Sequence, residues 1–280
     1  MVTRYSRQAV LGLMIAAVAV SADAAGQATP ASESALPPHV VRTVKLTVGD
    51  VDEITAFYEK MVGMTEMNRY VDEGRLVAPF MGFGDPEQWL GLMSYTQREG
   101  LEKSPYPVAV IYTAEFDDMV ARFEAAQYPL FLVPSTDTGG LRIAIATDPS
   151  GHVVELVDRA HIPAVGGSRL IVDDRQKAEE FFLRIFGETA VTPGQRFETE
   201  AFDEVVMDFG GKMFVALFEP KGVAPLPKST YPIVAIYTTE LDAVMQRVEA
   251  EGFGYTKFGP GVFFVNDPSG NVVEIVRQRD

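Results

Sequence analysis

The hydrophobic and polar positions of residues 41–48 alternate, which is typical of a half-buried β-strand. Thr43 and Lys45 lie on the polar face of this predicted strand. Residues 52–62 then carry apolar side chains at helical spacing, and Gly63 follows as a C-terminal stop. The pattern therefore predicts a strand followed by a helix at the start of the folded part.

The same pattern returns in the second half of the chain. Residues 169–172 predict a strand and an apolar helical pattern follows it. Phe57 matches Phe181 and Gly63 matches Gly187, each 124 positions further on. The sequence YPVAVIYT at 106–113 likewise matches YPIVAIYT at 231–238. These matches predict an internal repeat.

Each repeat closes on the same motif, DPSGHVVELV at 148–157 and DPSGNVVEIV at 267–276. Asp-Pro-Ser-Gly predicts a turn, because Pro presets φ, Asp caps the turn and Gly adopts conformations that other residues resist. The strand after it carries Glu155 in one copy and Glu274 in the other. A carboxylate in an apolar strand is costly unless it is paired, bound to a metal or facing a wet cavity. The two Glu are therefore candidate site residues.

The repeat predicts two tandem modules, at 40–160 and 165–280. Each module reads as two β-α-β-β-β halves, so the chain contains four copies of one supersecondary unit. One such unit cannot bury its sheet alone. We expect an α+β fold in which paired βαβββ units form curved mixed sheets around a cavity.

The N-terminal segment predicts export. Arg4 and Arg7 precede an apolar run at 9–20, and a small-residue cleavage pattern follows, so residues 1–25 read as a signal peptide. An uncleaved anchor helix is the alternative. Residues 26–39 are rich in Ala, Ser and Pro and predict a flexible leader. We expect a periplasmic or secreted protein.

Composition narrows the partners. The chain has 280 residues, a formal net charge of −15 and no Cys. The charge argues against nucleic acid and anionic membrane surfaces, and the absence of Cys excludes thiol nucleophiles and Cys-bound zinc. We expect a small-molecule ligand, no nucleic acid, no membrane contact after signal cleavage, and a monomer or homodimer.

The strand-Asp-helix openings (LTVGDVDEITAFYEKMVGM and LIVDDRQKAEEFFLRIFGE), the YPVAVIYT-type middles and the DPSG closings resemble the vicinal oxygen chelate superfamily. This superfamily includes glyoxalase I, bleomycin-resistance proteins, fosfomycin-resistance proteins and extradiol dioxygenases. The resemblance covers residues 40–280. It implies a sheet curled around a cavity, with a metal held in many members by a first-strand residue, a middle-strand residue and a last-strand Glu.

Carried over to this chain, the last-strand ligands are Glu155 and Glu274. The other ligand positions that the resemblance implies hold residues that are not metal ligands: Thr43, Gly167, Pro107 and Pro232. We therefore expect no metal cofactor. A divalent metal on Glu155 or Glu274 is the alternative.

Three His residues remain as candidate ligands. His39 is expected in the leader or just before the first strand, His152 in the DPSG turn facing solvent, and His161 in the linker between modules. None is expected to bind a metal.

Cations are expected where a metal sits in relatives. Lys45 on the first strand of one module corresponds to Arg169 in the other, 124 positions further on. Our hypothesis pairs Lys45 with Glu155 and Arg169 with Glu274, each within its own module, because a buried carboxylate needs a compensating charge. Strand-edge charges that face solvent are the alternative interpretation.

Further ligand-binding candidates lie on the same face. These are Thr43, Tyr112 and Tyr237, and the two Tyr together with Glu155 and Glu274 are also the catalytic candidates if the protein is an enzyme. Half-buried strand aromatics are the alternative interpretation of the Tyr pair. The many large apolar residues on the inner strands favour an apolar or aromatic ligand.

Three functions follow from these observations. The first is an exported protein that binds a small apolar or aromatic molecule in a cavity lacking the usual metal ligands. The second is a metal-dependent lyase, isomerase or dioxygenase that uses Glu155 or Glu274. The third is a structural or partner-binding scaffold. Whether the protein turns its ligand over stays open at this point, because this scaffold hosts many chemistries.

Overall fold

The computed structural model describes residues 37–278 apart from 97–102, 136–137, 139 and 160–161. The predicted signal peptide and most of the predicted leader lie outside these residues, as does His161. Within the described ranges, no helix has the length and apolar character needed to cross a membrane.

The first half of the chain contains two βαβββ units. Their elements are β1 (His39–Thr47), α1 (Val51–Phe57), its π-helical continuation η2 (Tyr58–Val62), β2 (Thr65–Asp72), β3 (Leu76–Gly82) and β4 (Trp89–Tyr95), then β5 (Ala109–Thr113), α2 (Phe116–Ala126), β6 (Leu130–Val133), β7 (Ile143–Thr147) and β8 (Val153–Asp158).

The second half repeats this order. Its elements are β9 (Ala164–Ile171), α3 (Arg175–Phe186), β10 (Thr192–Glu198), β11 (Phe202–Asp208) and β12 (Phe214–Pro220), then β13 (Val234–Thr238), α4 (Leu241–Ala250), β14 (Tyr255–Gly259), β15 (Val262–Asn266) and β16 (Val272–Arg277).

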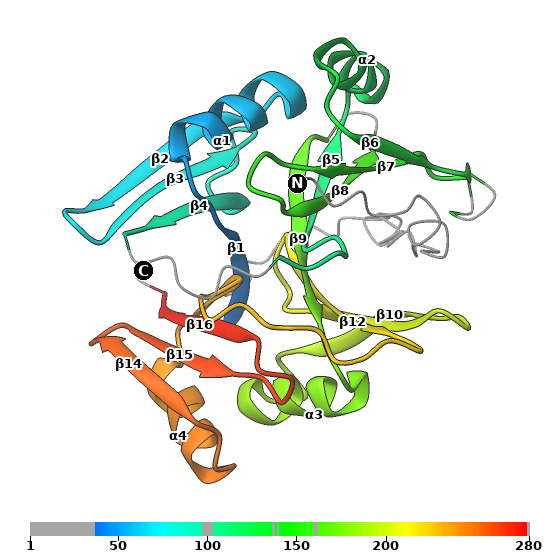
Figure 1. The fold of residues 1–280 in the computed structure, drawn as a ribbon. Coiled ribbons are helices and arrows are strands. Elements are labelled where there is room, and N and C mark those ends of the chain that lie inside the picture. Colours follow the sequence, from blue (N-terminus) through cyan, green and yellow to red (C-terminus); the bar gives the residue numbers. More distant parts are fainter. Residues whose placement is uncertain (1–36, 97–102, 136–137, 139, 160–161, 279–280) are drawn as a thin grey trace, which may run out of the picture.

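The four units pair into two sheets of eight strands each. Sheet A has the order β14-β15-β16-β13-β1-β4-β3-β2, and sheet B has the order β10-β11-β12-β9-β5-β8-β7-β6. The first unit therefore shares a sheet with the fourth, and the second with the third. The α+β fold of paired units is confirmed, but each sheet combines strands from both halves of the chain (Figure 1).

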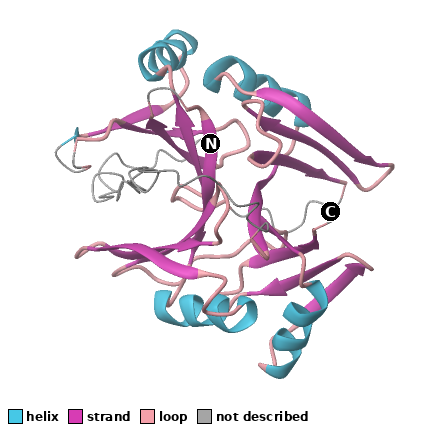
Figure 2. Cartoon of the chain, turned by 180° about the vertical axis from the view of Figure 1, so that it is seen from behind, coloured by secondary structure: helices cyan, strands magenta, loops and turns pink. Residues whose placement is uncertain are grey.

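Each sheet curves, and the helices cover its outer face. Helices α1 and α4 flank sheet A, and α2 and α3 flank sheet B (Figures 1 and 2). The alternation in β1 explains this layering, because Val44 and Leu46 are buried with the helix residues Ile54 and Phe57 in the main core. Thr43 and Lys45 consequently lie on the opposite face, which we call the concave face.

The two DPSG turns form as their sequence predicts. The Asp148 carboxylate accepts a hydrogen bond from the His152 backbone N–H at 2.9 Å, and the Asp267 carboxylate accepts one from the Asn271 N–H at 2.8 Å. The glycine in each turn adopts positive φ, 87° in the first and 92° in the second. Both turns thus deliver the following strand, β8 or β16, in the same way.

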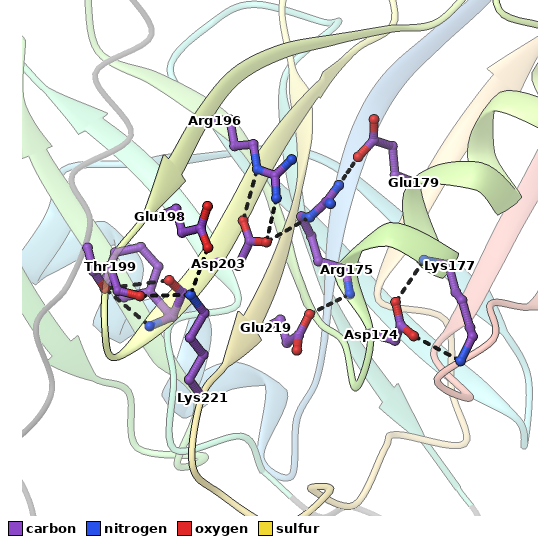
Figure 3. Close-up of polar contacts among 11 residues, drawn as sticks. Asp174, Arg175, Lys177, Glu179, Arg196, Glu198, Thr199, Asp203, Glu219 and Lys221 are labelled. Carbon is purple, nitrogen blue, oxygen red and sulfur yellow. Dashed lines mark hydrogen bonds and ion pairs between the residues drawn. The ribbon is translucent and has the colours of Figure 1, made fainter.

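An ion-pair network fixes the start of α3 to the outer face of sheet B (Figure 3). The Arg175 guanidinium donates to Asp203 at 3.1 Å, its backbone N–H donates to Glu219 at 2.7 Å, and Arg196 donates to Asp203 at 2.8 Å. Because side chains alternate along a strand, the residue after Asp203, Glu204, points to the concave face.

Candidate functional site

A charged pair lies on the concave face of sheet A. Lys45 on β1 donates to the Glu274 carboxylate on β16, and the two side chains are 10% and 12% exposed. In the strand order only β13 lies between β1 and β16. Its small residue Ala235 lies beside Glu274, so the Lys45 side chain can reach the carboxylate across β13. The pair therefore joins the first unit to the fourth.

A larger charged cluster lies on the concave face of sheet B. The guanidinium of Arg169 on β9 donates to Glu155 on β8 at 3.0 Å and to Glu204 on β11 at 2.7 Å. Arg169 is 1% exposed and both carboxylates are 0% exposed. We call Arg169, Glu155 and Glu204 the triad.

The predicted partners of the two cations were wrong. Lys45 pairs with Glu274 and not with Glu155, and Arg169 pairs with Glu155 and not with Glu274. The physical reason is the exchange of units between sheets, since a strand can reach only the carboxylates of its own sheet.

Glu204 was missed by the sequence interpretation. Its counterpart in the first repeat, 124 positions earlier, is Phe80, so the repeat gave no signal for it. Burial raises the pKa of Glu204, an effect that Arg169 opposes and Glu155 reinforces. One cation thus holds two buried carboxylates.

Aromatic side chains surround the pair of sheet A and are only half-buried. Phe80 on β3 and Trp89 on β4 contact each other with ring centres 5.4 Å apart. Tyr95 stacks on Tyr231 at 4.2 Å, and Tyr237 lies on β13. All five rings retain contact with solvent. The concave face of sheet A therefore offers an accessible aromatic surface.

The corresponding face of sheet B is packed. Tyr112, the counterpart of Tyr237, is buried together with Val110, Val157, Val206 and Phe214 in one apolar cluster. Burial raises the pKa of Tyr112 to about 12. Burial also raises the pKa of Tyr237, and Glu274 adds to the shift. Neither phenol is poised to act as a base near neutral pH.

A pocket lies where the two sheets meet. Its lining includes Lys45, Lys103, His152, Arg169 and Lys228. The His152 ring was expected to face solvent, and this was wrong: its Nε2 lies 2.8 Å from the Thr47 carbonyl oxygen and 2.9 Å from Lys103 Nζ. Burial, reinforced by the Lys103 charge, lowers the pKa of His152 to about 3. The ring links the DPSG turn to β1.

His39 is likewise structural. It is the first residue of β1 and is fully buried, not part of the leader. Its ring nitrogens lie 2.8 Å from Thr238 Oγ1 and 3.1 Å from the Phe186 carbonyl oxygen. Burial lowers the pKa of the ring, which keeps it neutral. Both ring nitrogens therefore have a hydrogen-bond partner within the core.

The donor set does not fit a divalent metal. Among the described residues, no group of three or more His, Asp or Glu side chains is arranged to hold one. Gly167 stands at the first-strand ligand position of the second repeat, and a Cβ there would lie 2.5 Å from the Phe214 carbonyl oxygen, so no ligating side chain can be accommodated. Lys45 and Arg169 occupy the carboxylates that relatives offer to a metal.

In the part of the chain that the structure describes, seven buried side-chain polar atoms have no hydrogen-bond partner. Three belong to the triad. The other four are Arg42 Nε, Thr43 Oγ1 and Trp89 Nε1 at the start of β1 and β4, and Gln278 Oε1. Sequence interpretation did not single out Arg42 or the indole of Trp89 as polar groups of the site.

Two sheets of paired βαβββ units, with charged residues on their concave faces, define the fold of a tandem glyoxalase-like protein. Residues 37–156 match the model of the Glyoxalase/Bleomycin resistance protein/Dioxygenase superfamily. The match confirms the resemblance of this part of the chain to the vicinal oxygen chelate proteins.

Solved structures extend the likeness to nearly the whole chain. Glyoxalase I from Zea mays aligns with a TM-score of 0.69 and 20% identity, covering 85% of this chain and 92% of its own. A putative dioxygenase from Bacillus subtilis aligns with a TM-score of 0.63 and 16% identity, covering 86% of this chain and 85% of its own. At these identities the likeness concerns the fold. No curated protein sequence matches the chain.

Proposed function

We propose that this protein is an exported member of the superfamily that binds a small apolar or aromatic molecule on the concave face of sheet A. The observation that carries this proposal is the contrast between the two faces. The aromatic side chains of sheet A are half-buried, whereas Tyr112, the counterpart of Tyr237 on sheet B, is packed into an apolar cluster. Accessible aromatic walls around a few polar groups are typical of small-molecule sites.

The proposed site works without a metal ion. Lys45 already binds the Glu274 carboxylate, and Arg169 already binds both carboxylates of the triad. A divalent cation at either place would have to displace a buried or half-buried side-chain cation. A metal-dependent lyase, isomerase or dioxygenase, the alternative suggested by the names of the structural relatives, would need such a displacement.

Sheet B supports a second, structural role. Its concave face carries buried apolar clusters around the triad. Because these side chains are packed, we assign the structural scaffold role to sheet B and the ligand site to sheet A. Export rests on residues 1–25, and a monomer or homodimer is the assembly we propose.

The chain supplies its own reporter for ligand binding. It has one tryptophan, Trp89, and that residue lies on the concave face of sheet A. Titration with alicyclic and single-ring aromatic compounds that do not absorb at the excitation wavelength should change its emission saturably. Tyr237→Phe should weaken the binding, and the matched variant Tyr112→Phe on sheet B should not.

Two results would contradict the proposal. One is a Trp89 emission that no compound of the panel changes, with no heat of binding in calorimetry. The other is an equal loss of affinity in Tyr112→Phe and Tyr237→Phe, because the ligand would then not distinguish the two faces.

A further inference from the structure

Two hydrogen-bond donors without a partner lie at one end of the sheet A face. Arg42 Nε and Trp89 Nε1 are buried and make no hydrogen bond. The Thr43 hydroxyl is buried beside them and interacts with the Tyr237 side chain. Arg42 and Thr43 are consecutive in β1, and Thr43 lies directly beside Trp89 in the parallel ladder between β1 and β4. Guanidinium and indole N–H groups can only donate, and a hydroxyl can donate as well. Buried polar groups normally have partners, so this cluster lacks an acceptor.

The donors adjoin the aromatic wall of the proposed site. The Arg42 guanidinium lies 5.4 Å from the centre of the Tyr237 ring. The Thr43 hydroxyl interacts with the Tyr237 hydroxyl and partly offsets the rise in the pKa of Tyr237 that burial causes. Trp89 contacts Phe80. A ligand whose ring contacts these aromatic side chains would therefore bring an attached acceptor group within the donor cluster.

Arg42 has the weaker ion pair of the two cations on this face. Lys45 already binds the Glu274 carboxylate. The nearest other acid, Glu87, reaches only Arg42 Nη2, at 3.5 Å, and its second oxygen binds Lys212 at 3.1 Å. The Nε side of Arg42 is left without a counter-charge.

Sheet B has no counterpart of Arg42. Gly166 occupies that position, 124 residues further on, and a Cβ there would lie 2.7 Å from the Tyr112 ring. Arg159 lies over the Tyr112 ring at 4.5 Å, and Arg169 binds both Glu155 and Glu204. The accessible face of sheet A therefore carries an arginine at a strand position where the packed face of sheet B has no room for a side chain.

We infer that the ligand of sheet A is a carboxylate attached to an aromatic or alicyclic ring, with the carboxylate held by Arg42, Thr43 and Trp89. A carboxylate supplies several acceptor sites and one negative charge, which suits the free donors Arg42 Nε and Trp89 Nε1, the Thr43 hydroxyl beside them and the charge of the Arg42 guanidinium. The ring contacts Phe80 and Tyr237. This inference rests on the proposed function of the face and specifies its ligand class.

Three compounds of the same shape test it. Calorimetry and Trp89 emission at pH 7.5 compare 3-phenylpropanoate, 3-phenylpropanamide and 3-phenylpropylammonium. Because hydrogen bonds to charged groups are about twice as strong as neutral ones, the acid should bind at least about tenfold more tightly than the amide. The ammonium compound should bind most weakly, because it meets a cation.

Variants locate the acid preference. Arg42→Met keeps an apolar stem over Tyr237 and should abolish the preference for acid over amide, whereas Arg42→Lys should retain part of it. Arg159→Met, which changes the matching cation beside Tyr112, should leave the preference unchanged. Near-UV circular dichroism of each variant checks that the fold is intact. Trp89→Phe should weaken binding of the acid, as measured by calorimetry.

The outcomes separate this inference from the proposed function. Equal binding of acid and amide, or an acid preference that survives Arg42→Met, would overturn the carboxylate assignment and leave a neutral-ligand site standing. No binding of any of the three compounds, nor of the wider ring-compound panel, would overturn both.

Discussion

Replacing Arg169 by Met should destabilise the protein more than any other single change on the concave faces. The substitution keeps an unbranched apolar stem and removes the only cation of the triad. Glu155 and Glu204, both 0% exposed, would then be buried without a counter-charge. Loss of one partner from a buried ionic group costs about 3–5 kcal/mol.

That cost is measurable as a shift of the unfolding temperature. A chain of this size loses about 2–4 °C per kcal/mol, so Arg169→Met should unfold about 6–20 °C below the wild type. Burial raises the pKa of Glu204 and Arg169 opposes that shift, so removing Arg169 should raise this pKa further. A protein that buries an acid with a raised pKa becomes less stable as the pH rises, so the variant should approach the wild type as the pH is lowered from 8 toward 5.

The repeat supplies a matched control. Lys45→Met removes the equivalent cation from sheet A, where Glu274 retains contact with water, and its cost should be smaller. The combined variant Arg169→Met, Glu155→Leu, Glu204→Leu should regain most of the loss, because apolar residues of similar volume replace buried ions without penalty. An Arg169→Met protein as stable as the wild type at pH 8 would refute the triad as a charged buried cluster.

Two further predictions concern the turns and the packing of sheet B. Burial raises the pKa of Asp148 and of Asp267 to about 6, against about 3.9 in an unfolded chain, so these groups should make the free energy of unfolding fall as the pH rises from about 4 to about 6. Urea titrations across this pH range should show a smaller fall in the free energy of unfolding in the double variant Asp148→Asn, Asp267→Asn than in the wild type. An equal fall in both proteins would contradict the burial argument. Gly167→Ala should cost about 1–3 kcal/mol by urea titration, because its Cβ would lie 2.5 Å from the Phe214 carbonyl oxygen, and wild-type stability would contradict the close packing.

The repeat explains why most of the fold was predictable. The alternation of residues 41–48, the glycine stop at Gly63 and the DPSG turns are local signals, and each produces the expected element. The β-α-β-β-β pattern includes strands β2 and β10, but the sequence did not indicate where they lie. Both are largely exposed edge strands, so no apolar alternation marks them, and β10 also contains Pro and Gly.

The pairing of units could not be read from the repeat. Because the two halves carry nearly the same pattern, Glu155 and Glu274 were equally suitable partners for Lys45. Only the long-range strand order distinguishes them. Glu204 was missed for the opposite reason, since it has no counterpart in the first repeat and a lone carboxylate in a strand carries no positional signal.

The export prediction and the site roles of Thr43, Tyr112 and Tyr237 stay predictions. The first concerns residues 1–25, which lie outside the described residues. The site roles can be tested only with a ligand. The two Tyr residues have equivalent backbone positions but different surroundings, since Tyr237 is half-buried in sheet A and Tyr112 is buried in sheet B.

Lys45 and Arg169 bind Glu274 and Glu155, the two carboxylates that the resemblance to the superfamily implies as metal ligands. Elemental analysis by mass spectrometry of the mature protein, purified without chelator and without a His tag, tests most directly whether these cations take the place of a metal. We predict no stoichiometric transition metal, also after incubation with Mn, Fe, Ni or Zn ions. About one equivalent of metal, lost in Glu155→Ala or Glu274→Ala, would contradict the claim and favour a metal-dependent enzyme.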